Sequence, residues 1–225
     1  MSITKTFLKV GASLMLTAFA ASNASAEMYI EGQLSMVDVK DVSTPVYSGS
    51  GGGFTFSNFK ASVKYDDTTS LGVEAGYRFT PNFRAGLSYT AFSLDMKSIN
   101  GSGTISDGTT TVDLSTSLTR GQLSGDSSFD NNVKLTMAQA YWDFQMDSAI
   151  TPYVGIGLGQ AKISNAGGTH GATSFTIGAN YDINENNYLG VRYNMTKVDG
   201  PTDTLGITYQ DIQANSIGIT YGYRF

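Results

Sequence analysis

The sequence of 225 residues contains no cysteine, 4 prolines, one histidine and one tryptophan. The lack of cysteine excludes a cysteine nucleophile, and it also excludes a lipid attached to an N-terminal cysteine after export. Charged residues make up only 15% of the chain, whereas soluble domains average about 25%. A chain with so few charges needs another way to stay dispersed, and a membrane is one such environment.

Long hydrophobic runs are also missing. After residue 26, no stretch approaches the run of roughly 18 apolar residues that marks a transmembrane helix. A membrane location would therefore require strands, because only helices and closed barrels satisfy their own backbone groups within a bilayer.

The first 26 residues predict a secretory signal peptide. Lys5 and Lys9 precede a short apolar run, and Ala24-Ser25-Ala26 forms a small-residue cleavage pattern. The apolar run is too short to cross a bilayer as a helix, which needs about 20 residues. A buried N-terminal helix is the alternative interpretation. We expect a signal peptide at 1–26 and one mature domain at 27–225.

The acidic balance of the chain argues against a nucleic-acid partner. The formal net charge is −5, from 14 basic and 19 acidic groups. Removal of Lys5 and Lys9 with the signal peptide leaves 12 basic groups and a net charge of −7. Phosphate binding requires clustered lysines and arginines, so we expect no nucleic acid among the partners.

Apolar and polar residues alternate with a period of two through most of the mature sequence. In the stretch SLGVEAGYRF, residues 70–79, every second residue from Leu71 to Phe79 is apolar or aromatic, while Glu74 and Arg78 lie on the other face. Eight stretches of this kind, each about 9–11 residues long, predict eight strands of the length that a tilted strand needs to cross a bilayer.

The connections between these stretches alternate in length. They are short at 80–82, 147–151 and 184–186, and long at 41–69, 95–132, 164–172 and 199–210. Short turns at one end and long loops at the other are typical of outer-membrane barrels. The last stretch, 216–225, is expected to pair with the first, since closure removes both exposed edges. We therefore predict an all-β fold, an eight-stranded antiparallel up-and-down transmembrane β-barrel.

Two segments of the long loops need separate treatment. Residues 58–70 alternate like a strand, but an extra strand would make the strand number odd, so we assign them to a loop or to the rim. Residues 99–131 are rich in Ser, Thr, Gly and Asp, which indicates a solvated and mobile loop.

The fourth strand, within 132–146, breaks the alternation. Leu135 and Met137 share one parity, whereas Trp142 and Phe144 share the other. A β-bulge between them would explain the change, and the faces of Lys134 and Asp143 cannot be assigned on this basis.

The charged residues of the regular strands all lie opposite the apolar ones. An arginine or lysine that faces lipid near the midplane costs roughly 2–4 kcal/mol. A soluble barrel would instead carry many Lys and Glu outside, whereas the polar face here is mostly Gly, Ser, Thr and Asn. We expect the apolar faces to meet lipid and the following residues to form a charge network inside the barrel: Glu31, Glu74, Arg78, Arg84, Asp182, Arg192 and Arg224.

Aromatic residues gather beside the short turns and the C-terminus. Rings with a polar tip settle at the headgroup level of a membrane, so this clustering predicts an interfacial girdle; the alternative is the core of an ordinary sandwich. Its members are Tyr77, Phe79, Phe83, Trp142, Phe144, Tyr153, Tyr181, Tyr188, Tyr221, Tyr223 and Phe225.

Three stretches, GYRFTPNFRAGLSY at 76–89, TPYVGIGLG at 151–159 and GYRF at 222–225, resemble the opacity-type outer-membrane β-barrel family. This family belongs with the small OmpA/OmpX-like barrels of Gram-negative bacteria, and the resemblance covers essentially the whole mature chain. It implies a place in the bacterial outer membrane, surface-exposed loops and, in some members, adhesion. It also implies that the barrel-assembly machinery reads the C-terminal strand, a role that would fall on Tyr221, Tyr223 and Phe225.

The sequence offers little material for catalysis, and we expect no catalytic, cofactor-binding or metal-binding residue. The glycines of GIGLG, 155–159, are spaced by two, which fits a strand face rather than a phosphate-binding loop. His170 lies between glycines, where Ser164 or Ser174 could approach it as in a lipid-modifying enzyme. Such a flexible segment positions catalytic groups poorly, so a solvated loop histidine is the favoured interpretation.

Eight strands leave an interior just wide enough for side chains, and paired internal charges would leave at most a narrow, gated pore. Long loops on a rigid barrel suit contact with partners. We therefore expect an integral outer-membrane protein with a structural and surface-interaction role, such as adhesion. A narrow gated porin for small solutes is the alternative, and a lipid-modifying enzyme is less favoured. The expected partners are outer-membrane lipids, the barrel-assembly machinery and host or matrix surfaces.

Overall fold

The computed structural model describes residues 27–123, 131–164, 166–200 and 209–225, so the expected signal peptide at 1–26 lies outside the described residues. No helix in these ranges is long and apolar enough to cross a membrane. A single short 3-10 helix, η1 (Arg120–Leu123), accompanies the strands there. The strands are β1 (Glu27–Val39), β2 (Val42–Ser43), β3 (Tyr47–Gly51), β4 (Phe54–Tyr65), β5 (Thr68–Thr80), β6 (Phe83–Leu94), β7 (Met96–Ser106), β8 (Thr111–Thr119), β9 (Asn131–Asp143), β10 (Ile150–Ile163), β11 (His170–Asp182), β12 (Asn187–Val198) and β13 (Ile212–Arg224).

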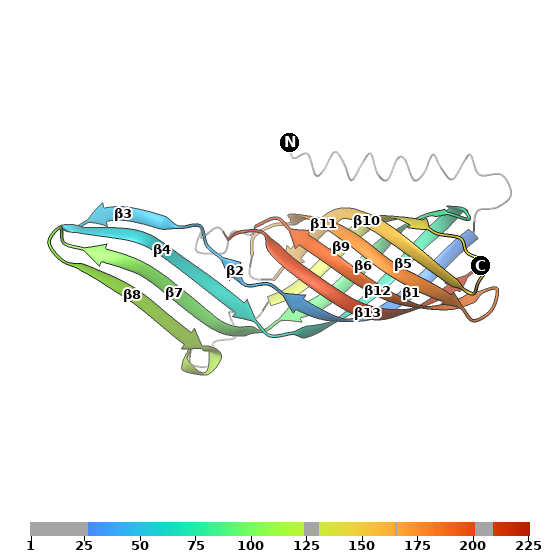
Figure 1. Cartoon of the computed structure of the whole chain (residues 1–225), viewed down its shortest axis with the longest axis horizontal. Helices are drawn as coiled ribbons and strands as arrows, with labels where there is room; N and C mark the ends of the chain where they lie inside the picture. The colour runs from blue at the N-terminus through green and yellow to red at the C-terminus, as the bar shows by residue number, and fades with distance from the viewer. Residues whose placement is uncertain (1–26, 124–130, 165, 201–208) are drawn as a thin grey trace.

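Eight of these strands close into an antiparallel barrel (Figure 1). Their order around the barrel is β1-β13-β12-β11-β10-β9-β6-β5, and β1 also pairs with β5. The predicted eight-stranded barrel is therefore confirmed, including the pairing of the last strand with the first. Its strands contain 12 to 14 residues. They are longer than the expected 9–11 residues, which is the length that crossing a bilayer requires.

The short turns lie at the end of the barrel that also holds the start of β1 and the end of β13 (Figure 1). Backbone hydrogen bonds tie this end together: the amide of Phe225 donates to the carbonyl of Met28 at 3.0 Å, and that of Arg224 donates to Asn186 at 2.7 Å. In outer-membrane barrels the short turns are periplasmic, so the opposite end is extracellular.

A second sheet extends from the extracellular end of the barrel (Figure 1). It has the order β2-β4-β7-β8, with β3 paired to β4, and we call it the extracellular sheet. The interpretation of 41–69 and 95–132 as loops is wrong for most of their length. The mobile loop expected at 99–131 is likewise wrong for the strands within 99–119, and its part at 124–130 lies outside the described residues. Their Ser and Thr residues alternate with Val, Ile and Leu across paired strands, and this pattern supports strands even where the composition is polar.

The fourth barrel strand, β9, contains no bulge. It pairs in unbroken register with β6, from Phe83↔Trp142 to Leu94↔Asn131, and with β10. The bulge prediction is wrong because the barrel interior changes character along its length: Leu135 and Met137 face an apolar upper interior, while Trp142 faces outward near the periplasmic end.

The two faces of the barrel otherwise follow the predicted parity. Apolar residues such as Leu71 (66% exposed) and Ile156 (62%) lie on the outer surface of the barrel, while Glu31 (1%) and Arg84 (1%) are buried inside it. Most of the expected girdle residues also face outward, among them Trp142. Tyr153 and Tyr188 are exceptions that correct the girdle prediction, since each is 2% exposed and lies inside.

Candidate functional site in the barrel interior

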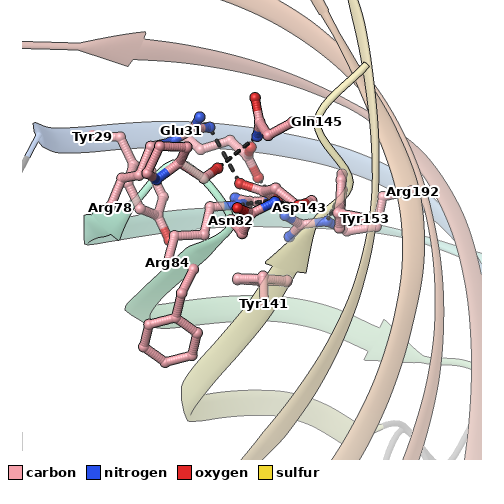
Figure 2. A network of polar contacts seen from close by, with 12 residues as sticks. Tyr29, Glu31, Arg78, Asn82, Arg84, Tyr141, Asp143, Gln145, Tyr153 and Arg192 are labelled. Atoms are coloured by element: carbon pink, nitrogen blue, oxygen red, sulfur yellow. Dashed lines mark hydrogen bonds and ion pairs between the residues drawn. The ribbon is translucent and has the colours of Figure 1, made fainter.

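The periplasmic half of the barrel encloses a network of ionised side chains (Figure 2). Each charged residue occupies an inward position of its strand, and the two-residue period of the strands brings groups from distant parts of the sequence together. All seven residues that the sequence analysis assigned to this network lie in it.

One cluster of the network centres on Arg192 of β12. Its Nη2 lies 2.6 Å from Oε1 of Glu31, and its Nη1 lies 3.6 Å from Oε2 of Glu74. Its Nε also donates a hydrogen bond to the hydroxyl of Tyr153 at 3.1 Å. Arg192 is 4% exposed and both carboxylates are less so, so each buried charge has an opposite charge as partner, as burial requires.

Glu74 is held in addition by two tyrosines. The hydroxyl of Tyr29 donates to its Oε1 at 2.6 Å, and that of Tyr141 donates to its Oε2 at 2.7 Å. Both carboxylate oxygens are therefore satisfied by short, charge-assisted hydrogen bonds.

A second cluster is built around Asp143, which is 0% exposed. Its Oδ1 lies 3.1 Å from Nε of Arg84, and its Oδ2 lies 3.3 Å from Nη2 of Arg78. The guanidinium of Arg84 also lies over the rings of Tyr141 and Tyr153, 4.1 and 4.5 Å from their centroids. Figure 2 shows these residues converging from different strands, and the cation–π contacts stabilise an arginine that water cannot reach.

A third pair lies at the periplasmic rim. Nη2 of Arg224 is 2.7 Å from Oδ1 of Asp182, and the Arg224 guanidinium lies 4.6 Å from the ring centroid of Tyr188. Glu27, at the start of β1, lies 4.0 Å from Arg78. The network thus continues to the mouth of the barrel.

The inward tyrosines are accommodated by glycines on the neighbouring strands. The register pairs directly opposite them are Tyr29↔Gly76, Tyr141↔Gly155, Tyr153↔Gly178 and Tyr188↔Gly222. A β-carbon added at any of these glycines would collide with the ring of its tyrosine. Glycine is therefore required at these positions because an aromatic ring lies across the strand.

Above the network, the extracellular half of the interior is apolar. A small cavity of about 50 Å3 is lined by residues of both halves, among them Arg192, Gln139 and Leu135. The buried apolar cluster consists of Val37, Val39, Val42, Leu94, Val133, Leu135, Met137, Ala161, Ile163, Ala172, Val198, Ile212 and Ala214.

Sequence reasoning missed several members of the interior. The change of parity in the fourth strand gives Asp143 no face from the sequence, although it directly follows outward-facing Trp142 and therefore lies inside. The apolar cluster could not be predicted from the sequence. Within one strand, an inward Val or Leu near the extracellular end cannot be distinguished from an outward one by residue type.

The structure does not join His170 to a serine. The hydroxyl of Ser174 donates to Gln139 at 3.4 Å, and that of Ser164 accepts from the amide of Asn132 at 3.0 Å. His170 begins β11 instead of lying in a loop, and its Nε2 is buried without a hydrogen-bond partner. Among the described residues, no group of three or more His, Cys, Asp or Glu is arranged to hold a metal ion.

The extracellular sheet has one apolar face and one polar face. On β7 and β8, the pairs Ile105↔Val112 and Ile99↔Leu118 share the apolar face, which also carries Leu114. The face continues onto β4 and β3, where Tyr47, Phe56 and Phe59 line a groove of about 430 Å3. The polar face carries the intervening residues Ser98, Asn100, Ser102, Thr104, Asp113, Ser115 and Ser117.

Comparisons with known proteins agree with this architecture. Residues 11–225 match the family model described as outer membrane protein beta-barrel domain. Among solved structures, the neisserial surface protein A (NspA) has 16% identity and a TM-score of 0.55, covering 90% of this chain and 100% of its own. OprG of Pseudomonas aeruginosa (17%, TM-score 0.47, 91% and 98%) and Ail of Yersinia pestis (13%, 0.44, 90% and 100%) are also similar. No curated protein sequence matches the chain.

A closed eight-stranded barrel with lipid-compatible outer faces and ionised groups sealed inside defines a small transmembrane barrel protein. The chain belongs to the outer membrane protein beta-barrel domain family. It is an integral protein of the bacterial outer membrane.

Proposed function

We propose that this protein is a closed, non-catalytic barrel that holds the extracellular sheet at the cell surface for contact with a partner protein, as on a host or matrix surface. The observation that carries the proposal is the exposed apolar face of that sheet. Phe59 (40% exposed), Leu114 (40%) and Val112 (50%) lie on it, outside the barrel. Exposed apolar side chains gathered on one face of an extracellular element are typical of interaction sites.

The partner that fits this surface best is an extended polypeptide segment. Strand β8 is the last strand in the order of the sheet, and every residue from Thr111 to Thr119 is exposed. An unprotected edge strand offers backbone groups for strand addition, and alternating apolar side chains select the incoming segment. Val112, Leu114 and Leu118 supply that alternation.

The barrel itself supports a scaffold better than a pore or an enzyme. Its periplasmic half is filled by paired charges, and its extracellular half by the apolar cluster. Conduction would require both the paired charges and the apolar cluster to move aside, so we do not favour the narrow gated porin. The serines near His170 bond elsewhere, which also weakens the case for a lipid-modifying enzyme.

Assembly of the barrel is proposed to depend on the outward aromatics of β13 and the terminus. Tyr221, Tyr223 and Phe225 are 54%, 38% and 70% exposed, and the rings of Tyr223 and Phe225 lie 5.0 Å apart. These rings face outward, where the barrel-assembly machinery and outer-membrane lipids can reach them during insertion.

The interaction role is tested by substitution on one face of the extracellular sheet. Bacteria that display the variant Leu114→Ser/Leu118→Ser should lose binding to cultured epithelial cells and to immobilised matrix proteins. The matched control Ser115→Ala/Ser117→Ala, on the polar face of the same strand, should bind as the unaltered protein does. Equal binding by both variants, with equal surface amounts, would contradict the proposal.

A further inference from the structure

Two lysines face each other across neighbouring strands at the extracellular end of the barrel. Lys134 of β9 and Lys162 of β10 are direct register partners. Their sequence neighbours Val133, Leu135 and Ala161 are buried inside, so the alternation of the strands directs both lysines outward, and both are exposed. Like charges placed directly opposite each other on one face of a sheet are destabilising.

This pair lacks the acidic partners that Lys64, Lys97 and Lys197 have at this end. Lys197 lies 2.7 Å from Asp211, and Lys64 lies 3.3 Å from Asp41. Within the described ranges, no ion pair involves Lys134 or Lys162. The carboxylate of Asp199 lies against Gly171 on the next strand and makes no ion pair with either lysine. The two ammonium groups therefore leave a local excess of positive charge on the outer surface.

The height of the pair on the barrel corresponds to the outer headgroup region. Trp142 lies at the periplasmic end of β9, and Lys134 lies eight residues earlier in the sequence, toward the extracellular end of the same strand. At about 3.3 Å per residue and a tilt of about 40°, this separation rises about 20 Å. The apolar band of such barrels is about 25 Å tall, and lysine side chains extend toward the nearer interface.

The surroundings of the pair change from apolar to polar at this height. Leu158, 56% exposed, faces outward below it, where an acyl chain would lie. Gln160 and Thr136 form the register pair just below the lysines, and they offer neutral hydrogen-bonding groups. Above Lys134, the hydroxyl of Ser93 lies 3.3 Å from Oδ1 of Asn132. Two cations among neutral polar side chains make a site for an anion.

We propose that Lys134 and Lys162 together bind a phosphate group of a lipid in the outer leaflet. A phosphate between the two ammonium groups would convert their repulsion into two attractions, and each ammonium has three protons to donate to phosphate oxygens. The two lysines face the bilayer, above lipid-facing Leu158. A lipid can therefore place its phosphate on the lysines and an acyl chain on Leu158, whereas a free phosphate contacts the lysines alone. This inference is independent of the extracellular sheet and goes beyond the proposed function.

The test compares the barrel with variants in neutral detergent. Protein free of phosphorylated lipid is mixed with diphosphorylated lipid A, with the same lipid after enzymatic removal of its phosphates, or with inorganic phosphate, and bound lipid is counted by native mass spectrometry. Lys134→Gln/Lys162→Gln should bind diphosphorylated lipid A about tenfold more weakly than the unaltered protein. The matched control Lys40→Gln/Lys197→Gln removes the same charge from the same rim and should bind normally.

Each outcome decides the question. Equal affinity of both double variants would overturn the proposal, and so would equal retention of the lipid without phosphates. Binding of inorganic phosphate as tightly as the lipid would show that the site does not recognise a lipid. A second readout does not depend on counting lipid: diphosphorylated lipid A should raise the thermal unfolding midpoint of the unaltered protein more than that of Lys134→Gln/Lys162→Gln.

Discussion

Asp143 is the most deeply buried carboxylate of the barrel interior and is shared by two arginines. It contacts both Arg84 and Arg78, and it is fully buried. Desolvation of so many ions is unfavourable, and their mutual attraction offsets it only when every charge keeps its partner. The stability of the barrel should therefore respond sharply to removal of one charge from this network and weakly to removal of an exposed charge.

We predict that Asp143→Asn destabilises the folded barrel by about 3–5 kcal/mol, because Arg84 would lose its carboxylate while remaining buried. The measurement is urea-induced unfolding in detergent, followed by the fluorescence of Trp142, the single tryptophan. Asp113→Asn, an exposed substitution on β8, is the control and should leave the midpoint unchanged. An unchanged midpoint for Asp143→Asn would show that the network tolerates an unpaired arginine.

Glycines opposite the inward tyrosines contribute at the same scale. Gly178→Ala should destabilise the barrel by about 1–3 kcal/mol, because the new methyl group would displace the ring of Tyr153 and disturb its bond with Arg192. Gly32→Ala is the matched control, since an added β-carbon there meets only the carbonyl of Tyr221 at 4.0 Å. Comparison of urea midpoints checks the prediction, and equal midpoints for the two variants would contradict it.

At the scale of elements, the extracellular sheet has its own local determinants. Its β7–β8 hairpin closes through Asp107, whose Oδ1 accepts hydrogen bonds from the amides of Thr110 at 2.7 Å and Thr109 at 2.9 Å. Gly108 supplies the positive φ of 89° that this turn needs. These contacts explain why a Ser- and Thr-rich segment forms a hairpin instead of a mobile loop.

The amides of Thr110 and Thr109 hold the pKa of Asp107 below its ordinary value of 3.8. Since folding lowers this pKa, the ionised carboxylate stabilises the turn above about pH 4, and this contribution is lost as the pH falls through the lowered pKa. Carboxyl-carbon NMR titration should therefore give a lower midpoint in the folded protein than in the urea-unfolded chain. In Asp107→Asn the hairpin amides should lose this acid transition, and its persistence there would assign it to another group.

At the scale of the whole molecule, closure and filling act together. The closed order of strands leaves no barrel edge unpaired, and an eight-stranded barrel is narrow enough for side chains to fill. The ionic network fills the periplasmic half and the apolar cluster fills the extracellular half. A closed, filled barrel of this kind is what the proposed role as a membrane anchor for the extracellular sheet requires.

We predict that purified monomers in planar lipid bilayers give no steady large-channel current. The cavity lined by residues of both halves of the interior is only about 50 Å3, and ions would have to displace paired charges to pass. A 16-stranded porin, which leaves an aqueous channel, is the positive control in the same bilayers. Steady large currents from the monomer would refute a filled interior.

Much of this architecture was predictable from local pattern. The parity of Glu74 and Arg78 against Leu71 and Val73 placed charges inside and apolar residues outside, because a strand alternates its side chains between two faces. Asp143 was not assigned because apolar residues lie on both faces of its strand, whereas Tyr153 was placed in the girdle from its position beside a short turn, although its parity with Gly155 and Gly157 puts it inside. The extracellular sheet was missed because composition, rather than alternation, decided the interpretation of 99–131.

The amino-acid sequence by itself determined the eight transmembrane strands, their two faces and the charges that a bilayer forces inward, because these depend on period and transfer energy alone. Only the tertiary structure decided which charges pair, where the interior becomes apolar, and that Lys134 and Lys162 stand opposite each other. Those features depend on register between strands, and register is set by contacts between residues far apart in the chain.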